Sequence, residues 1–348
     1  MSNHYELRPL KVPEDYESLA ELLNTFFSEP ISAGRLQEDD ANLYTVGHTY
    51  KDDDGLLAGY DRTRCVAVTK ENRIIGYVWS WRAPWTEPGC LNNTVVVSRE
   101  HRGRGIGGSL LEHLLQWGEG LGASKLVSEM WDDDPAARRF AERRGFAVER
   151  HMFQSVLELE RAEPSIVEEK ALFEELAGQG IRFRTLAEAG ETEENKRKIY
   201  EIYRRSLVDI PGFTGGVPDF YEWLKWHLQV EGYDPERVLL AVDGERGDYV
   251  AVSNLPYKEA TNGIYHEYTG VCPEYRGRKI ARALKIRAVQ LAKQQGAAYL
   301  KTDNDSLNGP ILRINQSLGY VPLRGSYRVV ADLAAVKKAL ASLPGEGV

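Results

Sequence analysis

The sequence predicts an α+β layered fold of two tandem domains, each a mixed β-sheet flanked by helices. Three observations lead to this prediction. One pattern occurs twice along the chain, β and helical patterns alternate within each copy, and a glycine-rich turn joins a central strand to a helix. The length of 348 residues suits two domains, each long enough to bury a core of its own.

The repeat is clearest in two segments, VVVSREHRGRGIGGSLLEHLL from Val95 and TGVCPEYRGRKIARALKIRAV from Thr269. Arg-Gly-Arg at 102–104 recurs at 276–278, and the same offset of 174 residues relates the Gly-aromatic pair near the end of each copy. An offset that holds across about 45 residues indicates a duplicated domain. The predicted parts are an N-terminal domain at 1–160, a charged connector at 161–179 and a C-terminal domain at 180–348.

Within the first copy, strand and helix patterns alternate. YELRPL predicts a strand, and apolar residues at helical spacing predict a helix over 13–27. Residues 65–81 predict two strands joined by a turn at 71–72. The further elements are a strand at 93–98, a helix at 105–122, a strand at 125–131, a helix at 135–144 and a strand at 146–159. The second copy repeats this order from IRFRTL.

The turn before the helix at 105–122 is the most informative motif. It reads Arg-Gly-Arg-Gly-Ile-Gly-Gly over 102–108. Glycines let backbone N–H groups approach a ligand, and a helix N-terminus adds unpaired donors and about half a positive charge. Such a turn suits a diphosphate. For a single copy, the alternative is a helix-capping turn with surface arginines.

A dinucleotide site is a second interpretation of this turn. Gly103, Gly105 and Gly108 satisfy the G-x-G-x-x-G fingerprint, and Glu129 follows about 20 residues later, as a ribose-binding acid would. However, the charged residues 99–102 separate the strand from the glycines. The second copy also lacks two of the three glycines. We therefore disfavour this interpretation.

Composition narrows the class of protein. With 52 acidic and 44 basic residues, the formal charge is −8. This charge disfavours a protein that binds nucleic acid or anionic lipid over a broad basic surface. Cys65, Cys90 and Cys272 are too few for a disulfide framework or a zinc site, and the seven histidines show no metal-ligand spacing. The N-terminus has no signal pattern. We expect a cytoplasmic protein that needs no metal, nucleic acid or membrane.

These motifs resemble the GNAT acetyltransferase superfamily, whose acyl-CoA loop follows a central strand and reads Gln/Arg-x-x-Gly-x-Gly/Ala. Arg102, Gly105 and Gly107 match this form in full, whereas the second copy has Lys279 at the first glycine position. Each copy also ends a helix with a Gly-aromatic pair, in FAERRGF and LRINQSLGY. The tandem arrangement resembles that of mycothiol synthase-like acetyltransferases.

The resemblance implies an enzyme that transfers an acetyl group directly from acetyl-CoA to a primary amine of a small molecule in a ternary complex. It also implies that both copies contact acetyl-CoA through the central strand, the loop and the later helix. The implied binding residues are Val96, Val97, Arg102, Gly103, Arg104, Gly105, Ile106, Gly107 and Gly108 in the first copy, and Val271, Arg276, Gly277, Arg278, Lys279, Ile280, Ala281, Asn308 and Asn315 in the second.

The expected catalytic residues depart from the family pattern in both copies. The family often places a tyrosine four residues before the Gly-aromatic glycine as general acid, and Ala141 and Asn315 stand there instead. Glu267 alternates with Tyr265 and Thr269 on a strand face from which relatives often supply the general base. The alternative for Glu267 is a hydrogen-bonded structural role. The first copy thus has the better loop and the second copy the better base.

Two other functions stay open at this point. The missing tyrosines motivate a non-catalytic acyl-CoA sensor or scaffold, and an N-acetyltransferase acting on proteins or peptides is a further option. Substrate specificity is expected in residues 28–63 and in the segment from Asp209, where the family builds its substrate side. At this point four properties stay open: the acceptor amine, the acyl chain length, the oligomeric state and which copy is catalytic.

Overall fold

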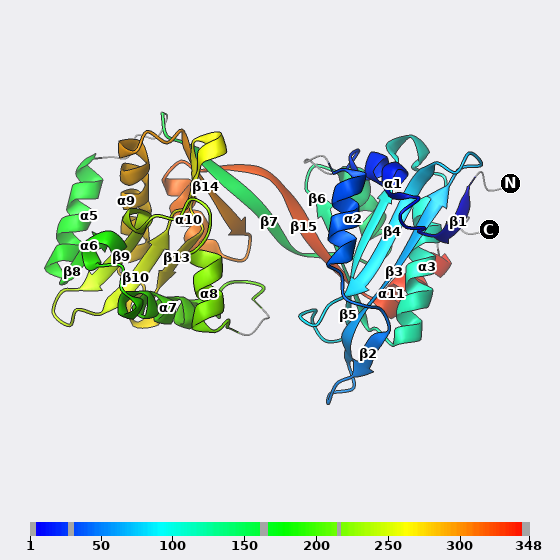
Figure 1. Cartoon of the computed structure of the whole chain (residues 1–348), viewed down its shortest axis with the longest axis horizontal. Helices are drawn as coiled ribbons and strands as arrows, with labels where there is room; N and C mark the ends of the chain where they lie inside the picture. Colours follow the sequence, from blue (N-terminus) through cyan, green and yellow to red (C-terminus); the bar gives the residue numbers. More distant parts are fainter. Residues whose placement is uncertain (1–4, 27–30, 161–165, 214–216, 343–348) are drawn as a thin grey trace. The chain divides into compact units, whose positions relative to one another are not determined.

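The computed structural model describes residues 5–26, 31–160, 166–213 and 217–342, and it divides into two compact units (Figure 1). Unit 1 comprises Met1–Arg150 and Ser326–Val348, and unit 2 comprises His151–Gly325. These units differ from the predicted ranges 1–160 and 180–348 at the ends of both copies. The last strand of each copy contributes to the unit built by the other copy.

Unit 1 is built on one mixed sheet with strand order β1-β3-β4-β5-β6-β15 and with β2 paired to β3. Only β5 and β6 run parallel; the other described pairs in this unit are antiparallel. Its strands are β1 (Glu6–Pro9), β2 (His48–Lys51), β3 (Leu57–Val68), β4 (Ile74–Arg82), β5 (Cys90–Val97), β6 (Lys125–Trp131) and the end of β15 (Val321–Asp332).

Helices cover both faces of this sheet. Alternate residues of β3 enter different cores, with Val66 packing near α1 and Ala67 packing under α3. The helix α3 buries the predicted leucine stripe and ends at Gly122, whose φ of 72° is left-handed. The helices of unit 1 are α1 (Tyr16–Leu23), α2 (Ala33–Ala41), η1 (Arg99–His101), α3 (Ile106–Leu121), α4 (Pro135–Glu142) and α11 (Leu333–Ser342). The helix expected at 13–27 is therefore present as α1, while residue 27 lies outside the described residues.

Unit 2 contains two sheets, because its central strand is interrupted. The first sheet has the order β13-β10-β9-β8 and the second β7-β14-β12-β11. The strands are β7 (Ala147–Glu158), β8 (Ile181–Thr185), β9 (Val238–Asp243), β10 (Tyr249–Asn254), β11 (Tyr257–Lys258), β12 (Gly263–Tyr265), β13 (Tyr268–Val271) and β14 (Tyr299–Asp305). The helices are α5 (Ile166–Gly178), α6 (Leu186–Ala189), α7 (Glu193–Leu207), α8 (Phe220–His227), η2 (Pro235–Arg237), η3 (Glu259–Thr261), η4 (Pro273–Tyr275), α9 (Ile280–Gln294) and α10 (Gly309–Ser317).

The segment expected to be a connector is largely part of unit 2. Residues 161–165 lie outside the described residues, and α5 follows them. Leu172 and Leu176 of α5 are buried in the core of unit 2. This helix therefore stabilises the unit rather than only linking two domains.

An exchange of last strands completes both units. Residues 152–158 of β7 pair antiparallel with β14 in unit 2, although they follow the first copy in sequence. Residues 326–332 of β15 pair antiparallel with β6 in unit 1. Val329 and Ala331 of β15 are then buried in the core beneath α3. The strand expected at 146–159 thus exists, but most of it belongs to unit 2.

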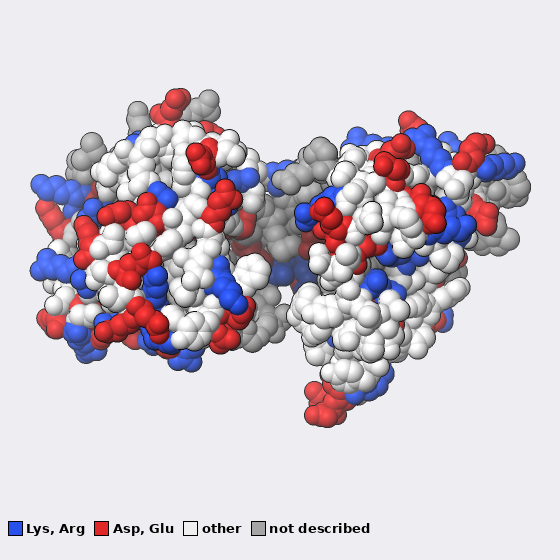
Figure 2. Space-filling model, viewed as in Figure 1, with Lys and Arg blue, Asp and Glu red and all other residues white. Residues whose placement is uncertain are grey.

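The surface carries both signs of charge. On the face shown in Figure 2, Lys and Arg side chains lie among Asp and Glu side chains over unit 2 and over the upper part of unit 1, whereas the lower part of unit 1 is mostly uncharged. Within the described residues, no helix is long and apolar enough to cross a membrane.

Candidate active site

The central strands of unit 1 separate part-way along their length. β5 stays paired with β4 as far as Val97, but its pairing with β6 ends at Asn93. The buried amide of Asn93 holds this point together, because it donates to the carbonyl of Val127 at 3.0 Å and accepts from the Ser80 hydroxyl at 2.6 Å. Beyond Asn93, β5 and β6 diverge and leave an opening at the edge of β5.

A cavity of about 280 Å³ occupies this opening. At one end it is bordered by the predicted loop, through Arg102, Gly103, Gly105, Ile106, Gly107 and Gly108. Farther along α3 it is bordered by buried apolar side chains, namely Leu111, Leu114, Met130, Ala141, Phe146 and Val329. The cavity therefore joins an exposed glycine-rich mouth to an apolar interior.

Most of the residues expected at this site in the first copy line the cavity, but two do not lie where the sequence placed them. Val97 lines the cavity together with the loop residues. The side chain of Val96 is only 3% exposed and packs in the core beneath α1, on the other face of the sheet. Arg104 is exposed and is not among the described lining residues.

Three glycines of the loop have a steric reason. Gly103 and Gly105 have φ angles of 76° and 81°, in the left-handed region that costs other residues about 1–2 kcal/mol. Gly107 begins α3 where α4 crosses closely, and a Cβ there would lie 2.9 Å from the ring of Phe140. The glycines thus shape the turn and allow the two helices to approach above the cavity.

Arg102 fixes the loop to its surroundings. Its Nε donates to the carbonyl of Val97 at 3.2 Å, and its Nη1 donates to Asp134 at 3.0 Å. Asp134 in turn caps α4 by accepting from the backbone N–H of Ala137 at 2.9 Å. Burial disfavours the charged carboxylate, but these hydrogen bonds still hold the pKa of Asp134 below its ordinary value. Arg102 therefore links β5, the loop and α4.

The loop of unit 2 keeps the same backbone path. Gly277 has a φ of 76°, and Lys279 adopts a φ of 65° where unit 1 has Gly105. Arg276 donates through Nε to the carbonyl of Val271 at 3.1 Å, as Arg102 does to Val97.

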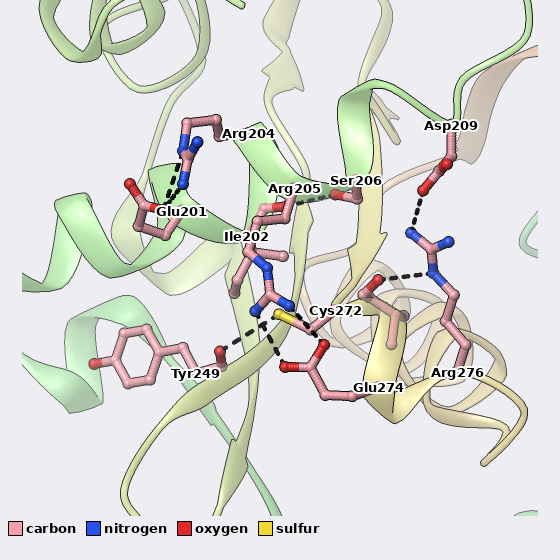
Figure 3. Close-up of polar contacts among 11 residues, drawn as sticks. Glu201, Ile202, Arg204, Arg205, Ser206, Asp209, Tyr249, Cys272, Glu274 and Arg276 are labelled. Carbon is pink, nitrogen blue, oxygen red and sulfur yellow. Dashed lines mark hydrogen bonds and ion pairs between the residues drawn. The ribbon is translucent and has the colours of Figure 1, made fainter.

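Acidic side chains pair with the basic side chains of the loop of unit 2. Arg276 pairs with Asp209 at 2.7 Å, and Lys279 pairs with Glu175 at 2.9 Å. Figure 3 shows Arg276 directed at Asp209 and, beside it, Arg205 directed at Glu274. All these side chains are more than 40% exposed, and exposed pairs contribute at most about 1 kcal/mol each. The pairs alone would therefore not exclude a diphosphate.

The interior of unit 2 differs more strongly from that of unit 1. At the offset of 174 residues, Leu111, Met130, Ala141 and Phe146 correspond to Lys285, Asn304, Asn315 and Tyr320. These four side chains of unit 2 are buried. The Lys285 ammonium lies 5.3 Å from the centre of the Tyr320 ring, and Asn315 donates to Asn304 at 2.8 Å. Polar side chains thus fill the position of the apolar interior in unit 1.

Two of the predicted cofactor contacts of the second copy, Asn308 and Asn315, lie in different surroundings. Asn308 begins α10 at the position that Asp134 holds before α4, but its side chain does not cap the helix. Asn315 is buried at 3% exposure within the polar interior. Sequence reasoning treated both as cofactor contacts, because it could not see that Lys285 and Tyr320 meet beside them.

The family model described as the acetyltransferase (GNAT) family matches residues 16–146 and 196–310. The chain belongs to the GNAT acetyltransferase family. No curated protein matches the sequence.

Solved structures share this tandem GNAT fold. A GCN5-related N-acetyltransferase from Sphaerobacter thermophilus aligns with a TM-score of 0.59 at 20% identity, over 96% of this chain and 97% of that chain. A tandem GNAT protein from the clavulanic acid biosynthesis pathway aligns with a TM-score of 0.56 at 15% identity, over 94% and 98% of the two chains. A fungal glucosamine N-acetyltransferase region aligns with a TM-score of 0.60 at 16% identity, over 95% of this chain and 38% of that chain.

Glu267, the expected base, lies in the second GNAT unit at the break between β12 and β13. Its carboxylate accepts hydrogen bonds from His227 Nδ1 and Asn254 Nδ2, and its side chain is 18% exposed. It borders a recess of about 10 Å³ together with Tyr203 and Tyr268. Burial and the nearby Glu267 charge raise the pKa of Tyr203 to about 12.

The expected alternation of Tyr265, Glu267 and Thr269 on one face is wrong. The strand breaks at residues 266–267, and the Thr269 hydroxyl instead contacts buried His266 at 2.7 Å. Tyr268 takes the place beside Glu267. Period-two alternation fails here because it holds only within an uninterrupted strand.

Glu129 is a candidate proton acceptor that the sequence analysis did not identify as one. It is the only carboxylate among the described residues that line the cavity of the first GNAT unit. It lies on β6 directly after Ser128, whose hydroxyl donates to the carbonyl of Asn93 at 2.8 Å. Its place just beyond the end of the β5–β6 pairing is the signal that could have identified it. The described residues contain no cluster of three or more potential metal ligands.

Proposed function

We propose that this chain transfers an acetyl group from acetyl-CoA, held in unit 1, to a primary amine of a small molecule. The observation that carries the proposal is the cavity of about 280 Å³ between the diverging strands β5 and β6, beside the glycine loop. Unit 2 has the same loop path but a polar, filled interior. The proposal therefore assigns one cofactor site to the chain.

The residues of unit 1 fit acetyl-CoA. Backbone N–H groups at the start of α3 offer donors and the positive end of the helix dipole to a diphosphate, and Gly103 and Gly105 let it approach. The apolar walls beyond the loop suit a pantetheine arm. The edge of β5 between Thr94 and Val97 is no longer paired with β6, so its backbone can bond the arm and stabilise charge on the thioester oxygen. When bound, acetyl-CoA supplies an activated acyl group.

Glu129 is the proposed proton acceptor of unit 1. An amine with a pKa near 10 is only about one part in a thousand neutral at pH 7, so a base that takes its proton assists transfer. Glu129 supplies a carboxylate to the cavity, directly or through a water molecule. This assignment replaces Glu267, which lies in the unit with the filled interior.

One observation favours a second candidate function. Ala141 borders the cavity at the position where relatives often have a tyrosine that acts as general acid. The site therefore has no tyrosine at that position to protonate the leaving thiolate. A unit that binds acyl-CoA without turnover would act as a sensor or scaffold.

A thiol-release assay with acetyl-CoA across a library of small amines tests the proposal. We expect turnover by the full chain, weaker binding and slower turnover in Gly105→Lys, and binding without efficient turnover in Glu129→Gln. Calorimetry on the same samples reports binding separately. Acetyl-CoA binding with no turnover on any amine would favour the sensor, and absence of binding would contradict both functions.

A further inference from the structure

The recess of about 10 Å³ beside Glu267 in unit 2 has aromatic walls. Among the described residues that border it, four carry side-chain rings, namely Tyr203, Trp223, His227 and Tyr268. The Tyr203 ring centre lies 4.6 Å from the ring centres of both His227 and Tyr268, and its plane is inclined to theirs by 49° and 45°. Because the rings are tilted rather than stacked flat, they form an aromatic cup with one carboxylate on its border.

Glu267 keeps a negative charge and unused acceptor positions. His227 Nδ1 donates to one carboxylate oxygen, and Asn254 Nδ2 donates to the other. A carboxylate has about four lone-pair positions, so it can accept further hydrogen bonds. A neutral imidazole and an amide donate without adding charge. The side chain of Glu267 is only 18% exposed, and a carboxylate removed from water in this way is stabilised by a cation.

No lysine or arginine of the described residues pairs with Glu267. Helix α7 forms one wall of the recess and carries two arginines close by in sequence. Figure 3 shows Arg204 directed at Glu201 and Arg205 directed at Glu274. These cations are therefore engaged by other carboxylates. A ligand, rather than a described side chain, would supply the cation that balances Glu267.

The size and chemistry of the recess select the group that it binds. A volume of about 10 Å³ holds one group the size of a water molecule, which suits a primary ammonium but not a trimethylammonium group. Ring faces attract cations, and a carboxylate accepts charge-assisted hydrogen bonds from N–H groups. Burial and the Glu267 charge raise the pKa of Tyr203 to about 12, and burial also raises the pKa of Tyr268. Both phenols therefore stay neutral, and the carboxylate disfavours an anionic ligand.

We propose that unit 2 binds the primary ammonium group of a small organic amine at Glu267, within the aromatic cup. The ammonium donates to the Glu267 carboxylate and lies against the ring faces. The carbon chain of the amine leaves beside Glu267 and His227, whose side chains are each 18% exposed. This inference goes beyond the proposed function, because the site takes no part in acetyl transfer and needs no acyl-CoA. It gives unit 2 a role in recognising amines.

Calorimetry on the full chain without acetyl-CoA tests the inference. The probe is n-butylammonium, and the comparison compounds are tetramethylammonium, 1-butanol and butyrate at equal ionic strength. We expect butylammonium to bind at least tenfold more tightly than each comparison compound. Tetramethylammonium is too large for the recess, butanol lacks the charge, and butyrate is repelled by Glu267.

Two pairs of variants locate the bound amine. Glu267→Gln should weaken butylammonium binding at least tenfold, because a charge-assisted hydrogen bond becomes a neutral one, whereas Glu129→Gln in unit 1 should retain this binding. Tyr203→Leu should weaken binding about two- to fivefold through loss of a ring face. Tyr203→Phe keeps the ring and should match the parent. The Tyr203 pair also provides a test if Glu267→Gln does not fold.

The outcomes separate this inference from the proposed function. Equal affinities for butylammonium and tetramethylammonium would overturn the inference, and so would binding that is lost in Glu129→Gln but kept in Glu267→Gln. Equal effects of Tyr203→Leu and Tyr203→Phe would show that the rings do not hold the amine. Each of these results leaves the acetyl-CoA site of unit 1 intact. Absence of acetyl-CoA binding would instead overturn the proposed function and leave the amine site of unit 2 standing.

Discussion

Leu111 and Lys285 occupy equivalent positions on α3 and α9, separated by 174 residues, and Leu111 borders the cavity of unit 1. Lys285 is 1% exposed and directs its ammonium toward the ring of Tyr320. A leucine leaves an apolar wall against which a cofactor arm can pack. A lysine in the same place puts a polar group into the path of that arm. This pair explains why two copies of one fold have different interiors.

The first prediction is that the chain binds one acetyl-CoA. Unit 1 should bind because its cavity is open, and unit 2 should not because Lys285 and Tyr320 fill the corresponding space. Calorimetric titration of the full chain should give a stoichiometry of about one, and Gly105→Lys should weaken acetyl-CoA binding, because a residue with a side chain is strained at the φ of 81° that Gly105 adopts. A stoichiometry of two would show that unit 2 is also a cofactor site.

The second prediction concerns Lys285 and the pH dependence of stability. Burial lowers the pKa of Lys285 to about 7 from about 10.5 in the unfolded chain. Between these values the unfolded state binds more protons than the folded state, so this residue makes the free energy of unfolding rise from pH 7 to pH 10.5. At pH 7 and below, the cost of the buried ammonium is fully present, at most a few kcal/mol.

Lys285→Met removes this titration while keeping a side chain of similar length. We expect the variant to be more stable than the parent at pH 7 and to gain less stability on going to pH 9. Urea unfolding at pH 7, 8 and 9 measures both effects. Parallel pH dependences in the two proteins would mean that the Lys285 ammonium is solvated in the folded state.

The third prediction concerns Gly107, where α3 and α4 meet. Gly107→Ala places a methyl group about 2.9 Å from the Phe140 ring, so the ring must move and acetyl-CoA binding should weaken. Strain of this kind typically costs about 1–3 kcal/mol. Gly120→Ala is the matched control on the same helix, because nothing lies near its added methyl group, and it should stabilise α3 by up to about 1 kcal/mol. Phe140→Leu should relieve the effect of Gly107→Ala. Equal effects of the two alanine variants would rule out the steric explanation.

The fourth prediction compares the two candidate bases under identical conditions. Glu129→Gln should lower kcat by about 100- to 10,000-fold with little change in KM, and raising the pH should partly restore the rate because more amine is then neutral. Glu267→Gln should leave kcat nearly unchanged, because Glu267 lies in the unit whose interior is filled. Steady-state kinetics on the best amine decides between them. The reverse pattern would place proton transfer at Glu267, the candidate base on the central strand of the second copy.

The sequence alone determined the duplication, most of the strands and helices of the first copy, and the glycine-rich turn of unit 1. A constant offset and local periodicity suffice for the first two, because both patterns are short-range. Positive φ angles at Gly103, Gly105 and Gly277 follow from the freedom of glycine at these positions. The family could be identified for the same reason, since its motif lies within one continuous stretch.

The tertiary structure alone decided which copy has an open interior. Leu111, Met130, Ala141 and Phe146 are separated by up to 35 residues, as are their four counterparts in unit 2 (111 to 146 and 285 to 320). Whether such side chains enclose a cavity or fill it depends on how they pack together, which no local pattern records. The surroundings of Glu267 were hidden for a similar reason, because the break in its strand changes which neighbours it meets.

The exchange of β7 and β15 was also decided only in the folded chain. Both strands end corresponding copies and carry the same alternation of buried and exposed residues, so each has an apolar face that suits either sheet. Alternation specifies which face of a strand is buried, but it does not specify the neighbouring strand. The pairing of β15 with β6 and of β7 with β14 joins residues about 150 to 200 positions apart. Such partners are selected by long-range contacts, which the local pattern of a strand does not encode.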